Sequence, residues 1–228
     1  MTKTKIKHLG FIMDGNRRWA KKRGLPSLMG HKKGYQIALK IGEACLDRGI
    51  EMVTFWAFST ENWKRSKTEV SYLMKLLKQA LSDDIKELVD KNIRLRVIGR
   101  LNDLPKDLQE AAREAMELTK NNTRGNLNLA ISYGGQAEIV DGINKLIKEG
   151  VKKVTPESFA EYLYDPQMPA PDLIIRTSGE ARTSGFLLWH SAYSELYFTQ
   201  TPWPAFSEKD LNLALEDFAK RQRRFGGN

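Results

Sequence analysis

The stretch "HLGFIMDGNRRWAKKRG", residues 8–24, decides the fold. Its apolar beginning breaks at Asp14-Gly15-Asn16, a strong turn signal, and therefore predicts a short buried strand. The basic segment 17–24 that follows predicts a short helix, which Gly24 and Pro26 stop. A buried strand, a turn and a helix in succession form the repeating unit of an α/β fold.

The same alternation runs through the rest of the chain. Further strands are predicted at 51–59, 93–99, 127–132, 172–176 and 192–199. Further helices are predicted at 30–50, 66–92, after Pro105, from about 134, and from 207 into a basic tail. The helix at 66–92 has the clearest apolar stripe, with Thr68 as its cap. We expect one α/β domain over residues 1–228, with a central, mostly parallel sheet flanked by helices.

Composition and cysteine usage favour a cytoplasmic protein. The chain has 228 residues, of which 41% are hydrophobic, and no stretch approaches the roughly 20 apolar residues of a membrane span. Cys45 is the single cysteine, so no internal disulfide can form and a reducing compartment is expected. Cys45 falls on the apolar side of a predicted helix, which indicates a structural thiol.

The charge is positive and unevenly distributed. The net charge is +9, and the first 40 residues contain eleven Lys and Arg against one acid, Asp14. Such an excess favours an anionic partner, which could be a nucleic acid, an anionic membrane surface or a phosphorylated small molecule. The charge alone does not choose among these three.

Three polar loops follow predicted strands: 14–19 ("DGNRRW"), 59–65 ("STENWKR") and 176–185 ("RTSGEARTSG"). Ligands of parallel α/β sheets bind beyond the carboxyl ends of the strands. The three loops are therefore expected to face one cleft.

The third loop contains Arg-Thr-Ser-Gly twice. Each arginine offers a planar fork of donors that matches phosphate, and glycine lets backbone N–H groups approach closely. The repeat therefore suits an anion-binding loop, although a solvated surface turn has the same composition.

Asp14 is the acid among these basic residues. It could cap the following helix, but a carboxylate in an arginine-rich phosphate site also suits a Mg²⁺ ion held between it and the phosphate. Ser59 or Thr60 could likewise cap a helical turn above Trp63. Glu195, an acid in an apolar strand, is expected to meet an arginine or a metal.

The quoted motifs together resemble those of the cis-prenyltransferases, whose bacterial type is undecaprenyl diphosphate synthase. "MDGNRRWAKKRG…GHKKG", "FSTENWKR", "RTSGEARTSGFLLWHSAYSELYFT" and the terminal "RRFGG" occur in the family's order over nearly the whole chain. The resemblance implies a single domain with about six mostly parallel strands, a hydrophobic tunnel and a homodimer. It also implies Mg²⁺-dependent condensation of isopentenyl diphosphate onto an allylic diphosphate such as farnesyl diphosphate.

Site residues follow from the resemblance by motif position. Asp14 and Asn62 are the implied catalytic residues, and Asp14 and Glu195 the implied metal ligands. A terminal Arg224-Phe225-Gly226 is expected to reach across the dimer. The implied substrate-binding residues are Gly15, Asn16, Arg17, Arg18, Trp19, His31, Ser59, Thr60, Glu61, Trp63, Arg65, Arg176, Arg182, Thr183 and Ser184, with Trp19, Phe58 and Trp63 bordering the prenyl chain.

Product length is predicted from the tunnel. The small Ala57 near its mouth favours a long product of the undecaprenyl class, with Leu77, Leu81 and Ile131 as floor residues. Alternatives are a short- or medium-chain synthase and a non-catalytic partner subunit. Ser27 replaces an arginine that is usual in the family, which puts one allylic-phosphate contact in doubt. We expect no nucleic-acid partner, and a peripheral membrane contact for product release.

Overall fold

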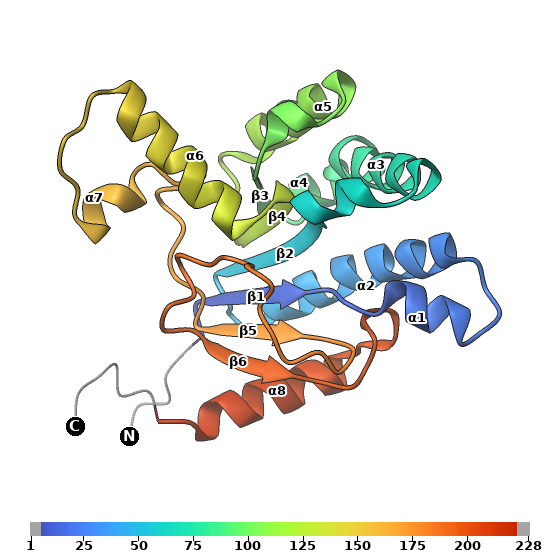
Figure 1. Ribbon diagram of the computed structural model, residues 1–228. Helices are drawn as coiled ribbons and strands as arrows, with labels where there is room; N and C mark the ends of the chain where they lie inside the picture. The colour runs from blue at the N-terminus through green and yellow to red at the C-terminus, as the bar shows by residue number, and fades with distance from the viewer. Residues whose placement is uncertain (1–5, 223–228) are drawn as a thin grey trace.

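The computed structural model describes residues 6–222 and is built around one six-stranded sheet (Figure 1). Every strand is parallel to its neighbours, in the order β3-β4-β2-β1-β5-β6. The single α/β domain predicted from the sequence is confirmed, and its sheet is entirely parallel. The strands are β1 (His8–Ile12), β2 (Met52–Ser59), β3 (Ile93–Ile98), β4 (Gly125–Tyr133), β5 (Leu173–Arg176) and β6 (Glu195–Phe198).

Helices supply the long crossovers that parallel strands require. The connection from β1 to β2 contains α1 (Asn16–Lys21) and α2 (Ser27–Asp47), and the next two contain α3 (Lys67–Ser82), α4 (Ile85–Asp90) and α5 (Lys106–Thr119). After β4 come α6 (Gly135–Lys148) and the short α7 (Pro156–Ala160), and α8 (Glu208–Lys220) follows β6. Short 3-10 turns lie at Thr60–Lys64 (η1), Leu101–Asp103 (η2) and Trp203–Ala205 (η3).

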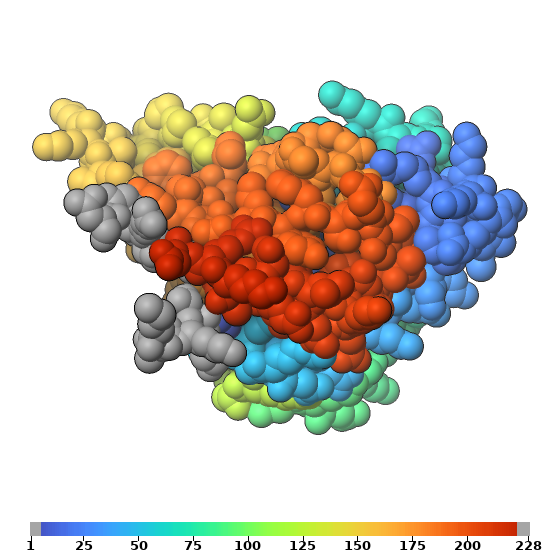
Figure 2. Space-filling model, turned by 90° about the horizontal axis from the view of Figure 1, so that it is seen from below, coloured from blue at the N-terminus to red at the C-terminus, as the bar shows by residue number. Residues whose placement is uncertain are grey.

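The two faces of the sheet are covered differently. In the larger core, apolar side chains of α2, α3, α5 and α8 pack against the strands. A smaller core on Ile12 and Ile174 is closed by Met168, Phe186 and Leu187, which come from irregular segments. In the view from below, α8 and the segments around β5 and β6 cover the middle of the face that is seen (Figure 2). Strands β1 to β5 are therefore largely buried, as expected for a parallel sheet, whereas the edge strand β6 is only half-buried.

The helix predicted at 66–92 is wrong as one continuous element. It breaks between α3 and α4, where Tyr35 of α2 and Gln79 both donate hydrogen bonds to the Asp84 carboxylate. Aspartate side chains compete with helical backbone bonding, so these side-chain contacts favour an interruption. Ser66, not Thr68, caps α3 and accepts a hydrogen bond from the Glu69 backbone N–H at 3.3 Å.

The turn between β1 and α1 depends on close approaches that only glycine permits. Gly15 has φ of 100°, and a Cβ there would lie 2.5 Å from Ser178 Oγ. A Cβ on Gly34 of α2 would lie 2.2 Å from Asn16 Oδ1. Gly15 occupies the N-cap position and no side chain caps α1, so Asp14 is not the helix cap. The Asp14 carboxylate is free for other contacts.

Candidate active site

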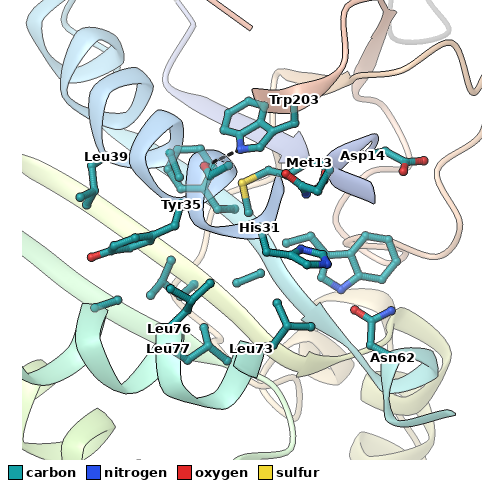
Figure 3. Close-up of a pocket in the computed structure, with 18 of the residues that line it drawn as sticks. Met13, Asp14, His31, Tyr35, Leu39, Asn62, Leu73, Leu76, Leu77 and Trp203 are labelled. Carbon is teal, nitrogen blue, oxygen red and sulfur yellow. Dashed lines mark hydrogen bonds between the residues drawn. The ribbon is translucent and has the colours of Figure 1, made fainter. Parts of the chain in front are cut away.

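A cavity of about 220 Å³ opens beside the carboxyl ends of β1 and β2 (Figure 3). Its lining is polar at one end and apolar at the other, with Asp14 and Asn62 far from Leu39 in the close-up. The polar lining includes Asp14, Gly15, Asn16, Arg17, Arg18, His31, Asn62 and Arg65, all eight predicted from the sequence, and also Tyr35, which was not predicted. The apolar lining includes Ala38, Leu39, Ala57, Leu73, Leu76, Leu77, Ala80, Leu88, Leu95, Leu127 and Leu129.

Asp14 lies at the centre of the polar end. Its Oδ1 accepts a hydrogen bond from the Gly15 backbone N–H at 2.7 Å, and its Oδ2 lies 3.1 Å from the Arg176 guanidinium and 3.5 Å from that of Arg18. Its carbonyl oxygen accepts from the Thr177 hydroxyl at 2.7 Å and from the Trp203 backbone N–H at 2.9 Å. The backbone is therefore fixed, while the carboxylate stays one-third exposed among positive charges.

The two Arg-Thr-Ser-Gly copies do different things. Arg176 is buried and donates to the Arg182 carbonyl oxygen at 2.6 Å and to Ser184 Oγ at 2.8 Å. Its Nε has no hydrogen-bond partner among the described residues, although it is buried. An unpaired buried N–H beside an exposed carboxylate indicates a place for an oxygen-rich ligand. This loop therefore is not a plain solvated turn.

Arg182 points outward instead. Its guanidinium pairs with Glu180 at 2.6 Å, and Glu180 also pairs with Arg18 at 2.9 Å. These contacts hold the pKa of Glu180 below its ordinary value, and the hydrogen bond from Arg182 has the largest effect. Glu180 was not predicted as a site residue; it ties the arginine of α1 to the arginine of the loop.

The loop after β2 is held by its own side chains. Ser59 caps η1, and Asn62 Oδ1 accepts a hydrogen bond from the Ser59 backbone N–H at 3.1 Å. Trp63 donates to Ser132 Oγ at 2.9 Å and packs edge-on against Phe58, with ring centroids 4.9 Å apart. These contacts fix Asn62 at the cavity wall, where its amide oxygen is already used as an acceptor.

A residue that the sequence reasoning missed lies beneath this loop. Glu69 of α3 is 8% exposed, and its Oε1 lies 3.0 Å from His31 Nε2 and 3.0 Å from the Arg65 guanidinium. Burial lowers the pKa of His31, and the bond to Glu69 opposes that shift. Arg65 directly precedes Ser66, the N-cap of α3, and lies four residues before Glu69. Opposite charges at this spacing at the start of a helix could have indicated the pair.

Other predicted residues lie off the cavity wall. Glu195 pairs with Arg221 at 2.7 Å, so it meets an arginine as expected. Glu195 is in register with Leu173 at the start of β5, whereas Asp14 follows the end of β1. Within this chain the two carboxylates therefore lie at opposite ends of the parallel strands. Also off the wall are Trp19, Phe58, Ser59, Thr60, Glu61, Trp63, Arg176, Arg182, Thr183 and Ser184. The loop 176–185 therefore contributes no residue to the cavity lining, although Arg176 contacts Asp14. Arg224-Phe225-Gly226 lies outside the described residues.

The apolar end agrees in part with the predicted tunnel. α3 and β4 supply walls as expected, and Ala57 and Leu77 line the cavity. Leu81 and Ile131 do not line it, because both are fully packed into the core. Cys45 is likewise buried, and burial raises the pKa of its thiol, as expected for a structural residue.

Metal-binding side chains do not cluster here. Within residues 6–222 no group of three or more His, Cys, Asp or Glu side chains is arranged to hold an ion. A Mg²⁺ ion needs only one or two carboxylates when substrate phosphates and waters complete its shell. The exposed carboxylate of Asp14, beside the arginines, fits that requirement.

The fold and the cavity define a class of α/β enzyme that holds an anionic head beside an apolar tail. The chain belongs to the undecaprenyl diphosphate synthase family of prenyltransferases. The family model described as "Putative undecaprenyl diphosphate synthase" matches residues 12–226.

Individual relatives are similar to this chain over nearly their full length. An isoprenyl transferase of Fusobacterium nucleatum is 48% identical, covering 100% of this chain and 98% of that protein. One of Thermotoga maritima is 47% identical, covering 96% of each chain.

Two crystal structures have the same fold. Lavandulyl diphosphate synthase of Lavandula x intermedia, in complex with dimethylallyl diphosphate, superposes with a TM-score of 0.92 at 36% identity, covering 97% of this chain and 98% of that one. A "probable undecaprenyl diphosphate synthase" of Campylobacter jejuni gives 0.83 at 32% identity, covering 98% and 99%. Among residues 6–222, no helix combines the length and apolarity needed to cross a bilayer.

Proposed function

We propose that this prenyltransferase condenses isopentenyl diphosphate onto an allylic diphosphate such as farnesyl diphosphate and makes a long Z-polyprenyl diphosphate near the undecaprenyl class. The observation that carries the proposal is the change of lining along one cavity, from Asp14 and arginines to leucines. An allylic diphosphate has the same two parts, an anionic head and an apolar chain. The head would lie at the polar end, and the growing chain would extend between α2, α3 and β4.

The two diphosphates are assigned to the two sides of Asp14. Asn16, Arg17, Arg18 and His31 come from α1 and the start of α2, and they would hold the allylic diphosphate. Arg176 and Ser184, with Arg182 swinging away from Glu180, would hold isopentenyl diphosphate. The unpaired Nε of Arg176 supports this second assignment, because a phosphate oxygen would satisfy it.

The residues present suit a reaction that develops charge. Cleavage of the allylic C–O bond sends its electron pair to the departing diphosphate and leaves an allylic cation. The π electrons of isopentenyl diphosphate then form the new C–C bond, and loss of a neighbouring proton restores a double bond. Arg17 and Arg18 would stabilise the departing negative charge, an effect that fixed cations exert strongly in a partly desolvated site.

Asn62 is assigned an orienting role. Its amide oxygen is a very weak base and already accepts the Ser59 N–H. A diphosphate oxygen or a water molecule would take the proton instead. Asp14 would hold Mg²⁺, which when bound supplies further charge stabilisation for diphosphate.

One observation supports a short product and another supports a long one. The cavity of about 220 Å³ exceeds the roughly 150 Å³ apolar cavity that binds benzene, but not by enough for an undecaprenyl chain, which favours a short- or medium-chain synthase as the second candidate. A further cavity of about 10 Å³ shares Leu39, Leu88 and Leu127 with the first and extends towards Lys91. This continuation supports growth along α2 once the walls separate.

A homodimer is part of the proposal. Its support is an exposed apolar row on α6, formed by Val140, Ile143 and Ile147 at 50%, 43% and 70% exposure. Such a row on a soluble chain favours a protein contact. Sedimentation of Ile147→Glu at the monomer mass would support this contact, and an unchanged dimer would exclude it.

The decisive experiment combines turnover and product length. Radiolabelled isopentenyl diphosphate is incubated with farnesyl diphosphate and Mg²⁺, and the dephosphorylated products are separated by chromatography. Leu76→Trp, which fills the cavity wall, should shorten the products, and Leu118→Trp on the exposed face of α5 is the matched control. No incorporation would overturn the synthase assignment, and a dominant labelled C20 alcohol, one condensation beyond the C15 primer, would establish the short-chain alternative.

A further inference from the structure

The connection between α1 and α2, with the end of α1 and the first turns of α2, forms a tip, residues 21–33, at one end of the molecule (Figure 1). Most of its side chains are exposed, whereas Gly30 and His31 are buried. Leu25 and Met29 are 39% and 46% exposed at this tip. Nearby, the Arg23 guanidinium lies over the Trp19 ring, 4.4 Å from its centroid. The tip therefore offers apolar side chains to solvent, next to an aromatic ring and a cation.

The charge around the tip has one sign. Between Asp14 and Glu43 the chain contains eight Lys and Arg and no acid. Lys21 and Lys32 are exposed, and neither has a carboxylate partner among residues 6–222. The positive potential of the tip is therefore left uncompensated within the described chain.

The tip is also next to the cavity mouth. Arg17 and Arg18 of α1 and His31 of α2 line the polar end of the cavity, and Lys21 and Lys32 lie on the same two helices facing solvent. A polyprenyl chain leaving the cavity is insoluble in water, so a lipid surface at the mouth would receive it without exposing it.

We propose that residues 21–33 dock on an anionic lipid bilayer, with Leu25 and Met29 inserted at the interface and Lys21 and Lys32 against acidic headgroups. This deepens the proposed function, because it assigns the surface through which the apolar product reaches its membrane. Two inserted side chains bind a bilayer weakly, and stable but reversible attachment needs a basic cluster as a second signal. The tip contains both.

The charge pattern favours lipid over other anionic or apolar partners. The tip has two exposed apolar side chains, fewer than the row on α6, whereas a stable protein interface buries on the order of 1,000 Å². The aromatic ring at the tip, Trp19, is covered by Arg23 and is not available as a base-stacking platform. A bilayer needs neither a large interface nor stacking.

The test is co-sedimentation of the substrate-free full chain with vesicles, so that its outcome does not depend on catalysis. Vesicles of equal parts phosphatidylcholine and phosphatidylglycerol are compared with pure phosphatidylcholine. The wild type should bind only the anionic vesicles, and added salt should release it. Each basic residue near such a surface contributes roughly fivefold in affinity, so Lys21→Ala with Lys32→Ala should weaken binding roughly 25-fold.

Matched variants separate the tip from general effects. Leu25→Glu with Met29→Glu should abolish binding, whereas Leu118→Glu with Leu213→Glu, on the equally exposed α5 and α8 surfaces, should not. Lys152→Ala with Lys153→Ala, in the exposed segment before α7, controls for charge. Prenyl transfer in detergent should be unchanged in the tip variants, which confirms folding.

Three results would overturn the proposal. The first is that the chain binds neutral vesicles as well as anionic ones, and the second is that the control variants lose as much binding as the tip variants. The third is that RNA displaces the chain from vesicles and that the Leu25→Glu, Met29→Glu variant still binds RNA. Absence of prenyl transfer together with intact tip-dependent vesicle binding would refute the proposed function and leave this inference standing.

Discussion

Replacing Glu69 by glutamine tests the buried network that the sequence did not reveal. Glu69 Oε1 accepts from the Arg65 guanidinium and lies within hydrogen-bond distance of His31 Nε2, both at 3.0 Å. Glutamine keeps the shape but removes the charge. Hydrogen bonds to charged groups contribute about 1.5–3 kcal/mol and neutral ones about 0.5–1.5 kcal/mol. The bond to His31 loses this difference in full and the bond to Arg65, which keeps its charged donor, loses part of it, so the two together cost about 2 kcal/mol.

The same loss should appear in catalysis, because His31 and Arg65 line the cavity. If Glu69 orients them for the transition state, about 2 kcal/mol corresponds to a roughly 30-fold fall in kcat/KM. The measurements are urea unfolding and steady-state prenyl transfer on Glu69→Gln, with Glu117→Gln in the exposed Lys120 pair as the control. A variant that loses stability but keeps its kcat/KM would refute the orienting role and leave Glu69 as a purely structural residue.

The other predictions concern the carboxylate, the two arginines and acid sensitivity. Asp14→Ala should keep the circular dichroism spectrum and lose most prenyl transfer; near-normal turnover at saturating Mg²⁺ would contradict its assignment. Arg176→Ala should raise the KM for isopentenyl diphosphate roughly a hundredfold and the exposed Arg182→Ala about tenfold, from the charged bonds that each can make; a rise confined to the allylic substrate would reverse the two phosphate sites. Burial lowers the pKa of His8 and of His190 from 6.5 to about 4. The unfolded chain therefore binds more protons between these pH values than the folded chain does. The free energy of unfolding should be highest above pH 6.5 and should fall towards pH 4 by about 3 kcal/mol per histidine. Urea midpoints that stay constant over this range would disprove this prediction.

Much of the site could be predicted because its residues are adjacent in the chain. The turn at Asp14 and the loop at Asn62 each follow an apolar strand, and the all-parallel sheet brings both strand ends to one edge. The roles of the paired arginines could not be predicted in the same way. Arg176 and Arg182 are followed by the same three residues, Thr-Ser-Gly, yet Arg176 is 5% exposed and the Arg182 side chain is 59% exposed.

Local patterning was also insufficient where a distant side chain intervened. The apolar stripe of 66–92 predicts one helix, and the contacts of Asp84 with Tyr35 and Gln79 accompany its division into two. The prediction of the tunnel's floor residues was wrong for two of them, for a related reason. Leu81 and Ile131 have the right period and polarity, but period identifies a buried face without telling whether a cavity or other side chains cover it.

The sequence by itself determined the strand–helix alternation, the positive charge of the first 40 residues and the loops that carry polar side chains. These are local properties, set by turn residues, hydrophobic period and composition within a few neighbours. Only the tertiary structure decided that Glu69 joins His31 to Arg65, that Glu195 pairs with Arg221, and which leucines face a cavity. Apart from the local Glu69–Arg65 pair, those outcomes depend on which residues distant in sequence are packed together, and burial then fixes which charges must be paired.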